Sequence, residues 1–238
     1  MCSDEVKHIS LQDKIIIDDK RKKNKHKPLR GIVIVKDTEG NIIYTKDNLV
    51  VRKGRELILR KLLNIPFVSQ TTTQLNNRKI CSFGIGIGGT PSNDPLNPLV
   101  PTPADSTLNT ETYFVVSPLT VPQQAKYLDS RVITVGPSTE TRWFKKKFTS
   151  DPELVLNAVP NADDPYNDEY YVKVNLAIDP EDCRGSNINE ICLFSGIQDI
   201  NDSSLFTNFQ IFSRITFPTE VFQIGSNKGL VIDYYIYA

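Results

Sequence analysis

The chain reads YYVKVNLAI at residues 170–178, where apolar and polar side chains alternate and β-branched and aromatic types are frequent. This period of two is typical of a strand with one buried face. Three later stretches have a similar composition: EICLF at 190–194, FQIFSRITF at 209–217 and LVIDYYIY at 230–237. We therefore expect the strands from Tyr170 onward to form one antiparallel sheet system.

The region from 31 to 45 predicts a β-hairpin. IVIV at 32–35 and IIYT at 42–45 flank a turn that contains Gly40 and Asn41. Both residue types tolerate a positive φ, which tight hairpin turns require.

A change to helical spacing predicts the main helix between Leu49 and Leu63. Ile58 lies four residues before Leu62, so the two share one face, and Pro66 is expected to end the helix. Five basic residues and one acid, Glu56, accompany them: Arg52, Lys53, Arg55, Arg60 and Lys61. Their side could contact phosphate or an acidic subunit. The alternative is a helix packed on a sheet with its Lys and Arg side chains in water.

Together these patterns predict a mainly β protein, an antiparallel β-sandwich with one principal α-helix and long loops. The 238 residues suffice for one domain. We place this domain at 29–238, after a charged and extended N-terminal arm at 1–28. Cys183 and Cys192 could be bridged, but reduced thiols are the better expectation for a protein made in the cytosol.

Two segments are candidates for interaction with other molecules. The arm contains a basic run, and a block of like charges seldom folds alone. The basic residues of this run are Lys20, Arg21, Lys22, Lys23, Lys25 and Lys27. It could lie on an acidic neighbour or on DNA, or remain a solvated tail. The second segment is a proline-rich loop at 91–103, with Pro91, Pro95, Pro98, Pro101 and Pro103. We expect contacts with other subunits to order both segments, because neither buries much apolar surface within its own chain.

Charge and composition exclude several classes of function. The 28 basic and 28 acidic residues balance, which argues against a general nucleic-acid binder, so that nucleic acid is expected only through the basic arm. No apolar run approaches the length of a membrane helix. The four cysteines are scattered without metal-ligand spacing, and the acidic loop at 163–169 lacks the spacing of an EF-hand. We expect no cofactor and no metal site, although the question of whether the acidic loop binds a metal ion stays open.

Catalytic motifs are weak in this sequence. Gly84, Gly86 and Gly89 match G-x-G-x-x-G, but prolines follow at once where a dinucleotide site needs a helix. We expect a strand and a turn there, whose glycines allow close backbone approach. Both histidines, His8 and His26, lie in the arm, so a nucleophile–histidine pair is not expected in the folded region. Trp143 to Phe148 reads as a strand that the lysines at 145–147 interrupt.

Several short motifs follow one another along the chain. They are NLVV at 48–51 before Gly54-Arg55, FGIGIGGT at 83–90, LNTE at 108–111, NEICLF at 189–194, LF at 205–206, FSRITF at 212–217 and LVIDY at 230–234. Their order resembles that of the small β-sandwich virion proteins of tailed bacteriophages, which are found among tail, baseplate, fibre-attachment and neck components. The resemblance covers roughly residues 45–238. The chain departs from it at Cys192, where glycine is expected, and at Ser213, where alanine is expected.

The resemblance implies a structural role without catalysis. We expect a non-enzymatic component of a phage particle, made in the host cytoplasm and located in the virion. It would assemble in multiple copies, as a ring or a trimer, with other virion proteins and without a membrane. Two alternatives remain. A receptor- or carbohydrate-binding tail module would show exposed aromatic residues in a shallow groove. A carboxylate-dependent hydrolase would show two neighbouring acids in a pocket.

Overall fold

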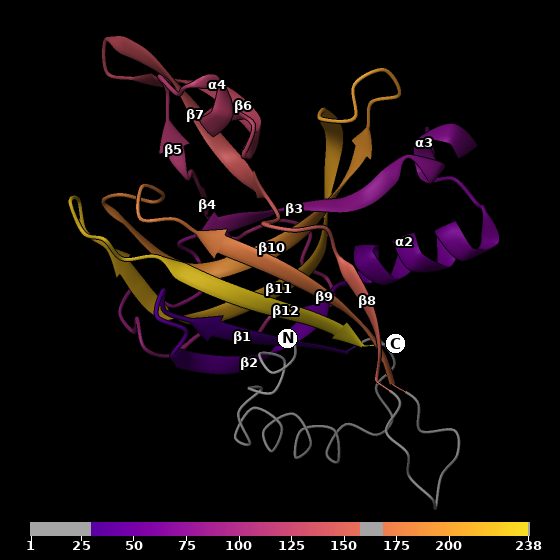
Figure 1. The fold of residues 1–238 in the computed structure, drawn as a ribbon, viewed down its shortest axis with the longest axis horizontal. Helices are drawn as coiled ribbons and strands as arrows, with labels where there is room; N and C mark the ends of the chain where they lie inside the picture. Colours follow the sequence, from indigo (N-terminus) through magenta and orange to yellow (C-terminus); the bar gives the residue numbers. More distant parts are fainter. Residues whose placement is uncertain (1–29, 158–168, 238) are drawn as a thin grey trace, which may run out of the picture.

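The computed structural model describes residues 30–157 and 169–237, and it shows a mainly β protein (Figure 1). The helices are α2 (Arg52–Leu63), α3 (Thr72–Asn76) and α4 (Val121–Gln124). The strands are β1 (Arg30–Lys36), β2 (Ile42–Val50), β3 (Arg78–Gly86), β4 (Glu111–Thr112), β5 (Val115–Val116), β6 (Tyr127–Val135), β7 (Ser138–Lys147), β8 (Glu153–Asn157), β9 (Glu169–Ile178), β10 (Ser186–Gln198), β11 (Phe206–Phe222) and β12 (Leu230–Tyr237).

All these strands belong to one antiparallel sheet. Its main path runs β5-β7-β3-β10-β11-β2-β1-β12-β9-β8, and β4 and β6 pair with β3 and β7 beside this path. The C-terminal strands form two pairs, β10 with β11 and β9 with β12. The predicted N-terminal hairpin, now β1 and β2, joins them by pairing with β12 and β11. The prediction of one antiparallel system from Tyr170 onward is therefore confirmed, with the hairpin as its central bridge.

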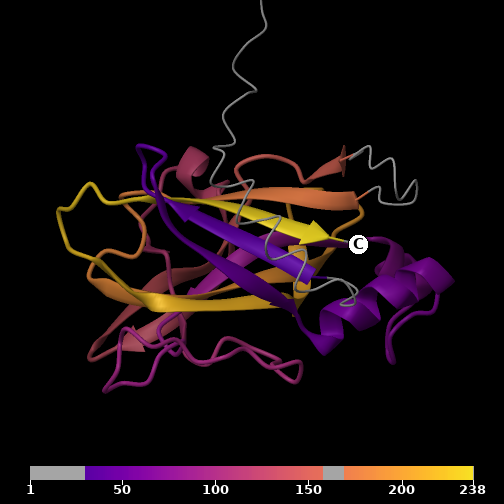
Figure 2. The same ribbon diagram turned by 90° about the horizontal axis from the view of Figure 1, so that it is seen from below.

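The sheet curls so that its two halves face each other across the core (Figure 2). Phe83, Ile191 and Phe217 come from β3, β10 and β11, and they pack in one cluster with Leu176 of β9 and Ile232 of β12. Burial of each such side chain is worth roughly 1.5–3 kcal/mol. The mainly β, antiparallel class is confirmed, but the two-sheet sandwich is not. Alternation along a strand reveals a buried face, and it cannot distinguish one curled sheet from two stacked ones.

Helix α2 follows β2 directly and confirms the predicted helix from Arg52 onward, whereas Leu49 and Val50 still belong to β2. Its first turn lies against β11, where a Cβ on Gly54 would be 2.2 Å from the carbonyl oxygen of Phe212. The helix ends at Asn64, which adopts a left-handed conformation with φ 54°, rather than at Pro66. Asparagine accepts this conformation at a helix C-terminus more readily than most residues.

The outer face of β10 and β11 is also buried, because the segment 88–110 covers it. A second apolar cluster forms there from Cys192 and Phe194 of β10 and Ile211 of β11, together with Val51 and Leu108. These strands are thus buried on both faces. This arrangement brings the long loops into contact with the centre of the sheet.

Candidate functional site

The charged residues at the centre of the outer face of β10 and β11 form a buried polar site with many hydrogen bonds. Glu190 of β10 is fully buried, and Arg214 of β11 donates to its Oε2 from Nε at 3.0 Å and from Nη2 at 2.5 Å. Arg214 also binds Asp105 through Nη1 at 2.6 Å. We call Glu190, Arg214, Asp105 and the neighbouring Asn189 the Glu190 cluster.

The same carboxylate holds two loop segments by their main chain. Glu190 Oε1 accepts from the amides of Gly88 at 3.2 Å and Thr110 at 3.1 Å, and Oε2 accepts from Asn109 at 3.3 Å. Asn189 Oδ1 accepts from the amide of Gly89 at 2.6 Å. Buried charges are tolerated when such bonds satisfy them. The cluster therefore fixes the turn after β3 and the segment before β4 on the sheet.

The glycine pattern finds its explanation here. A Cβ on Gly86 would lie 2.3 Å from Glu190 Oε1, and one on Gly89 would lie 2.1 Å from the carbonyl oxygen of Asn189. Gly84 and Gly86 belong to β3, and the chain then turns, as predicted. The spacing serves close packing of backbone on the Asn189–Glu190 pair.

Four of the motifs that carry the resemblance thus meet in space: the glycine turn, the LNTE segment, the Asn-Glu pair and the FSRITF strand. The sequence motifs included these residues, but they did not predict the ion pair between Glu190 and Arg214. The available signal was a charge of each sign inside an otherwise apolar strand.

The surroundings of Arg214 and Asp105 favour their charged forms. Burial alone would lower the pKa of Arg214, but the bonds to Asp105 and Glu190 raise it above its ordinary value. Partial burial raises the pKa of Asp105, yet hydrogen bonds from Thr102 and Arg214 outweigh burial and lower it. Both shifts follow from ion pairing in a poorly solvated site.

The proline-rich loop is fastened to its own domain. The carbonyl oxygen of Pro95 accepts from Thr219 of β11 at 2.8 Å, and that of Pro103 accepts from the amide of Arg52 at 2.9 Å. Thr216 donates to the carbonyl of Leu99, whose amide donates to Gly89. These anchors within the chain were not predicted, since prolines give no sign of where their carbonyl groups bond.

The side chains of this loop remain largely outside. Leu96 is 72% exposed and Val100 is 84% exposed. Pro95 and Pro103 are exposed, and Pro91, Pro98 and Pro101 are partly buried. The loop therefore presents apolar side chains on a backbone that the protein itself holds in place.

Two further ion-pair groups overturn the prediction that the lysines at 145–147 interrupt the strand. All three lie within β7, and Lys145 and Lys146 are buried. Lys146 Nζ lies 2.5 Å from Asp182 Oδ2 and 2.8 Å from Asp179, while Lys145 binds Asp129 at 2.7 Å and Glu111 at 2.9 Å. Lysine reads as exposed in a sequence, and only the fold brings carboxylates to it.

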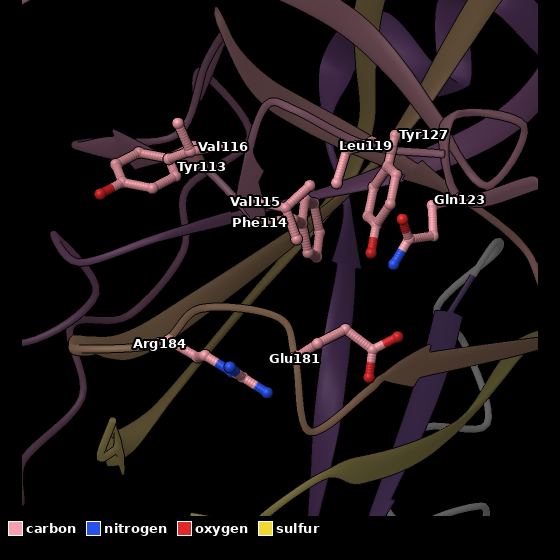
Figure 3. A pocket seen from close by; sticks show the side chains of 9 residues that line it. All are labelled: Tyr113, Phe114, Val115, Val116, Leu119, Gln123, Tyr127, Glu181 and Arg184. Carbon is pink, nitrogen blue, oxygen red and sulfur yellow. The ribbon is translucent and has the colours of Figure 1, made fainter. Parts of the chain in front are cut away.

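A pocket of about 310 Å³ opens beside this region, near β5 and α4 (Figure 3). Gln123, Glu181 and Arg184 supply the polar groups of its lining. The other lining residues are aromatic or aliphatic: Tyr113, Phe114, Val115, Val116, Leu119 and Tyr127. The hydroxyl of Tyr127 donates to Asp182 at 2.6 Å, and burial raises the pKa of Tyr127. Tyr127 is thus held as a neutral donor, and the pocket suits binding of an apolar group.

A second pocket of about 580 Å³ lies beside the Glu190 cluster and is lined by small polar residues, Thr90, Asn189 and Thr219 among them. The lining of this second pocket includes no aromatic side chain, which the carbohydrate-binding alternative calls for. The lining of the first pocket includes one acid, Glu181, whereas the hydrolase alternative calls for two neighbouring acids.

Other expectations have the following outcomes. Cys183 and Cys192 are buried free thiols. The basic residues at 20–27 and all but the last residue of the acidic loop at 163–169 lie outside the described residues. Within residues 30–157 and 169–237, no group of three or more His, Cys, Asp or Glu residues is arranged to hold a metal ion. In the same part of the chain, no helix has the length and apolar character needed to cross a membrane.

Comparisons of the whole chain with protein-family models, with curated proteins and with solved structures gave no match.

Proposed function

We propose that this chain is a non-enzymatic structural component of a bacteriophage particle, of the tail, baseplate, fibre-attachment or neck. It assembles in multiple copies with other virion proteins. We further propose that the two facing halves of the curled sheet correspond to the two layers of the β-sandwich virion proteins that the sequence resembles. Localisation in the virion and assembly as a ring or trimer belong to the same proposal.

One observation carries the proposal. The motifs of the resemblance converge on the Glu190 cluster, and this cluster, with the anchors of Pro95, Leu99 and Pro103, holds an exposed apolar loop in a fixed position. A loop that is ordered before binding loses less entropy when a neighbour docks on it. The buried ion pairs hold loops and strands together, which is what a stable building block requires.

The proline loop supplies the test. Leu96→Gln/Val100→Gln removes two exposed apolar side chains, and Ile200→Gln is a matched control because Ile200 is 77% exposed on a different loop. Negative-stain microscopy of the purified full chain should show rings or trimers for the wild type and the control, and dispersed particles for the loop variant. Unassembled wild type, or a loop variant that assembles as the wild type does, would contradict the proposal.

A further inference from the structure

β1 and β12 lie side by side in the sheet and carry a further apolar cluster on the face that points away from the main core (Figure 1). Alternate residues of these strands face the core, so the residues between them face the opposite side. The cluster on that side consists of Ile32 and Ile34 of β1, Tyr235 and Tyr237 of β12, and Tyr171 of β9. We call these five residues the tyrosine face. The centroids of its tyrosine rings lie 5.4–6.5 Å apart, so the three rings form one aromatic patch.

Burial on this side of the sheet is nearly complete at one end of β12 and incomplete at the other. Ile32 is 1% exposed and Tyr237 is 4% exposed, whereas Val231, on the same side of β12, is 38% exposed. Tyr237 pairs with Arg30, the first described residue, and Val231 pairs with Lys36 at the other end of β1. The cover of the tyrosine face therefore lies over the end at which the described chain begins.

A polar group marks where this burial ends. Asp233 lies between Val231 and Tyr235 on the same side of β12, and its carboxylate binds Lys36 at 2.8 Å and Lys173 at 3.7 Å. An apolar cover therefore needs to extend only over the tyrosine face and not over the whole length of the strands.

The described residues do not account for this burial. Among residues 30–157 and 169–237, the apolar side chains packed in the cluster all come from β1, β9 and β12. Neighbours within one sheet cover each other's flanks, but near-complete burial needs a second layer above them. The burial is present in a single chain, so that layer belongs to the same chain. Two stretches outside the described residues are available to supply it, 1–29 before β1 and 158–168 before β9.

The composition of the two stretches favours the arm. The arm contains ISLQDKIII at 9–17, with five large aliphatic residues, whereas 158–168 reads AVPNADDPYND and offers only Val159 and Tyr166 among its prolines and aspartates. The arm also joins β1 at Arg30, beside the buried end of the face. Residues 18–29 can extend over about 40 Å, more than the about 24 Å length of β1, so the aliphatic stretch can turn back onto the sheet.

We propose that residues 9–17 of the N-terminal arm lie on the tyrosine face of their own chain. The isoleucine side chains pack on Ile32, Ile34 and the tyrosine rings, and their burial offsets the entropy of ordering the arm. This inference concerns the single chain and does not rest on the proposed assembly. It makes the basic run at 20–27 the link between this cover and β1, and so keeps that run close to the sheet for contacts with other subunits.

Hydroxyl-radical footprinting of the full chain, read residue by residue by mass spectrometry, tests this cover. In the wild type, Ile32, Ile34, Tyr235 and Tyr237 should be oxidised slowly and Val231 quickly. Ile15→Gln/Ile16→Gln/Ile17→Gln should raise the oxidation of the four slow residues several-fold, toward that of Val231. The matched loop variant, Val159→Gln/Tyr166→Gln, should leave all of them unchanged. Both variants should keep the wild-type circular dichroism, because the substituted residues lie outside the sheet.

A photocrosslink gives a second readout that does not depend on disrupting the contact. A benzophenone amino acid in place of Ile16 should attach, on irradiation, to the peptides that contain 32–34 or 235–237 and give a product of monomer mass. The same group in place of Val159 should not reach 32–34. Exposure of the four residues in the wild type or the loop variant alone, an arm variant that stays protected, or a crosslink that misses the face would each overturn the inference. Protection that disappears on dilution, with crosslinks of dimer mass, would show that the arm of another copy supplies the cover and would overturn it as well.

Discussion

Two surfaces, the outer face of β10 and β11 and the exposed side of α2 with Leu59, Leu62 and Leu63, use charged and apolar residues in opposite ways. At the first, Glu190 and Arg214 are buried beneath the chain's own segment 88–110. At the second, leucines face solvent among basic residues. The two regions differ in what covers them. Where the chain supplies its own cover, charges can lie inside because every one finds a partner. Where the described part of the chain supplies none, apolar side chains stay exposed, and grouped exposed apolar side chains often mark interaction sites.

The most damaging change should be Glu190→Ala, which attacks the covered face. It leaves Arg214 with Asp105 alone and removes the acceptor of three loop amides. Removing one partner of a buried ion pair typically costs about 3–5 kcal/mol, and we expect a loss of the free energy of unfolding in that range. Urea unfolding followed by fluorescence measures it. Glu190→Gln, which keeps an acceptor oxygen, should lose less. A loss below about 0.5 kcal/mol for Glu190→Ala would mean that the cluster does not hold the loops.

A pair of leucines tests the other side of the comparison with one chemical change. Leu57 of α2 is 5% exposed and Leu62 is 78% exposed. Leu57→Ala should lower the free energy of unfolding by about 2–5 kcal/mol because it leaves a cavity. Leu62→Ala should change it by less than about 0.5 kcal/mol, as surface substitutions usually do. Thermal or urea unfolding at low protein concentration compares the two. Equal losses would mean that the monomer itself covers Leu62.

Local pattern was enough for the elements and not for their arrangement. Gly40 and Asn41 marked the hairpin, and leucine spacing marked α2, because both signals act over a few residues. The pairing of β1 with β12 joins residues about two hundred positions apart, for example Arg30 with Tyr237, and no local signal encodes it. Helical spacing likewise identified the apolar face of α2 but could not say whether anything covers it.

The candidate sites were predicted in part and for a similar reason. The proline loop was singled out for its length and composition and was expected to be ordered by other subunits. Its anchors at Thr219 and Arg52 belong to its own chain but lie far away in sequence, so no local signal pointed to them. Lys145 and Lys146 were misread because lysine is seldom buried, and their partners at Asp129 and Asp182 become neighbours only in the folded sheet. Glu190 and Arg214 belong to the motifs of the resemblance, but the ion pair between them was not predicted.

The smallest effect concerns Asp105, at the rim of the covered face. Its side chain is 14% exposed. Asp105→Asn should lower the free energy of unfolding by only about 1 kcal/mol at neutral pH, because Arg214 still pairs with Glu190. The pKa of Asp105 is lowered in the folded protein. Its charge therefore stabilises the fold above the ordinary aspartate pKa of about 3.9, and this contribution is lost as the pH falls through the lowered value. Unfolding curves at pH values from neutral to about 3 should show the variant and the wild type converging in acid. A difference that stays constant or grows as the pH falls would mean that Asp105 acts through packing rather than through its charge.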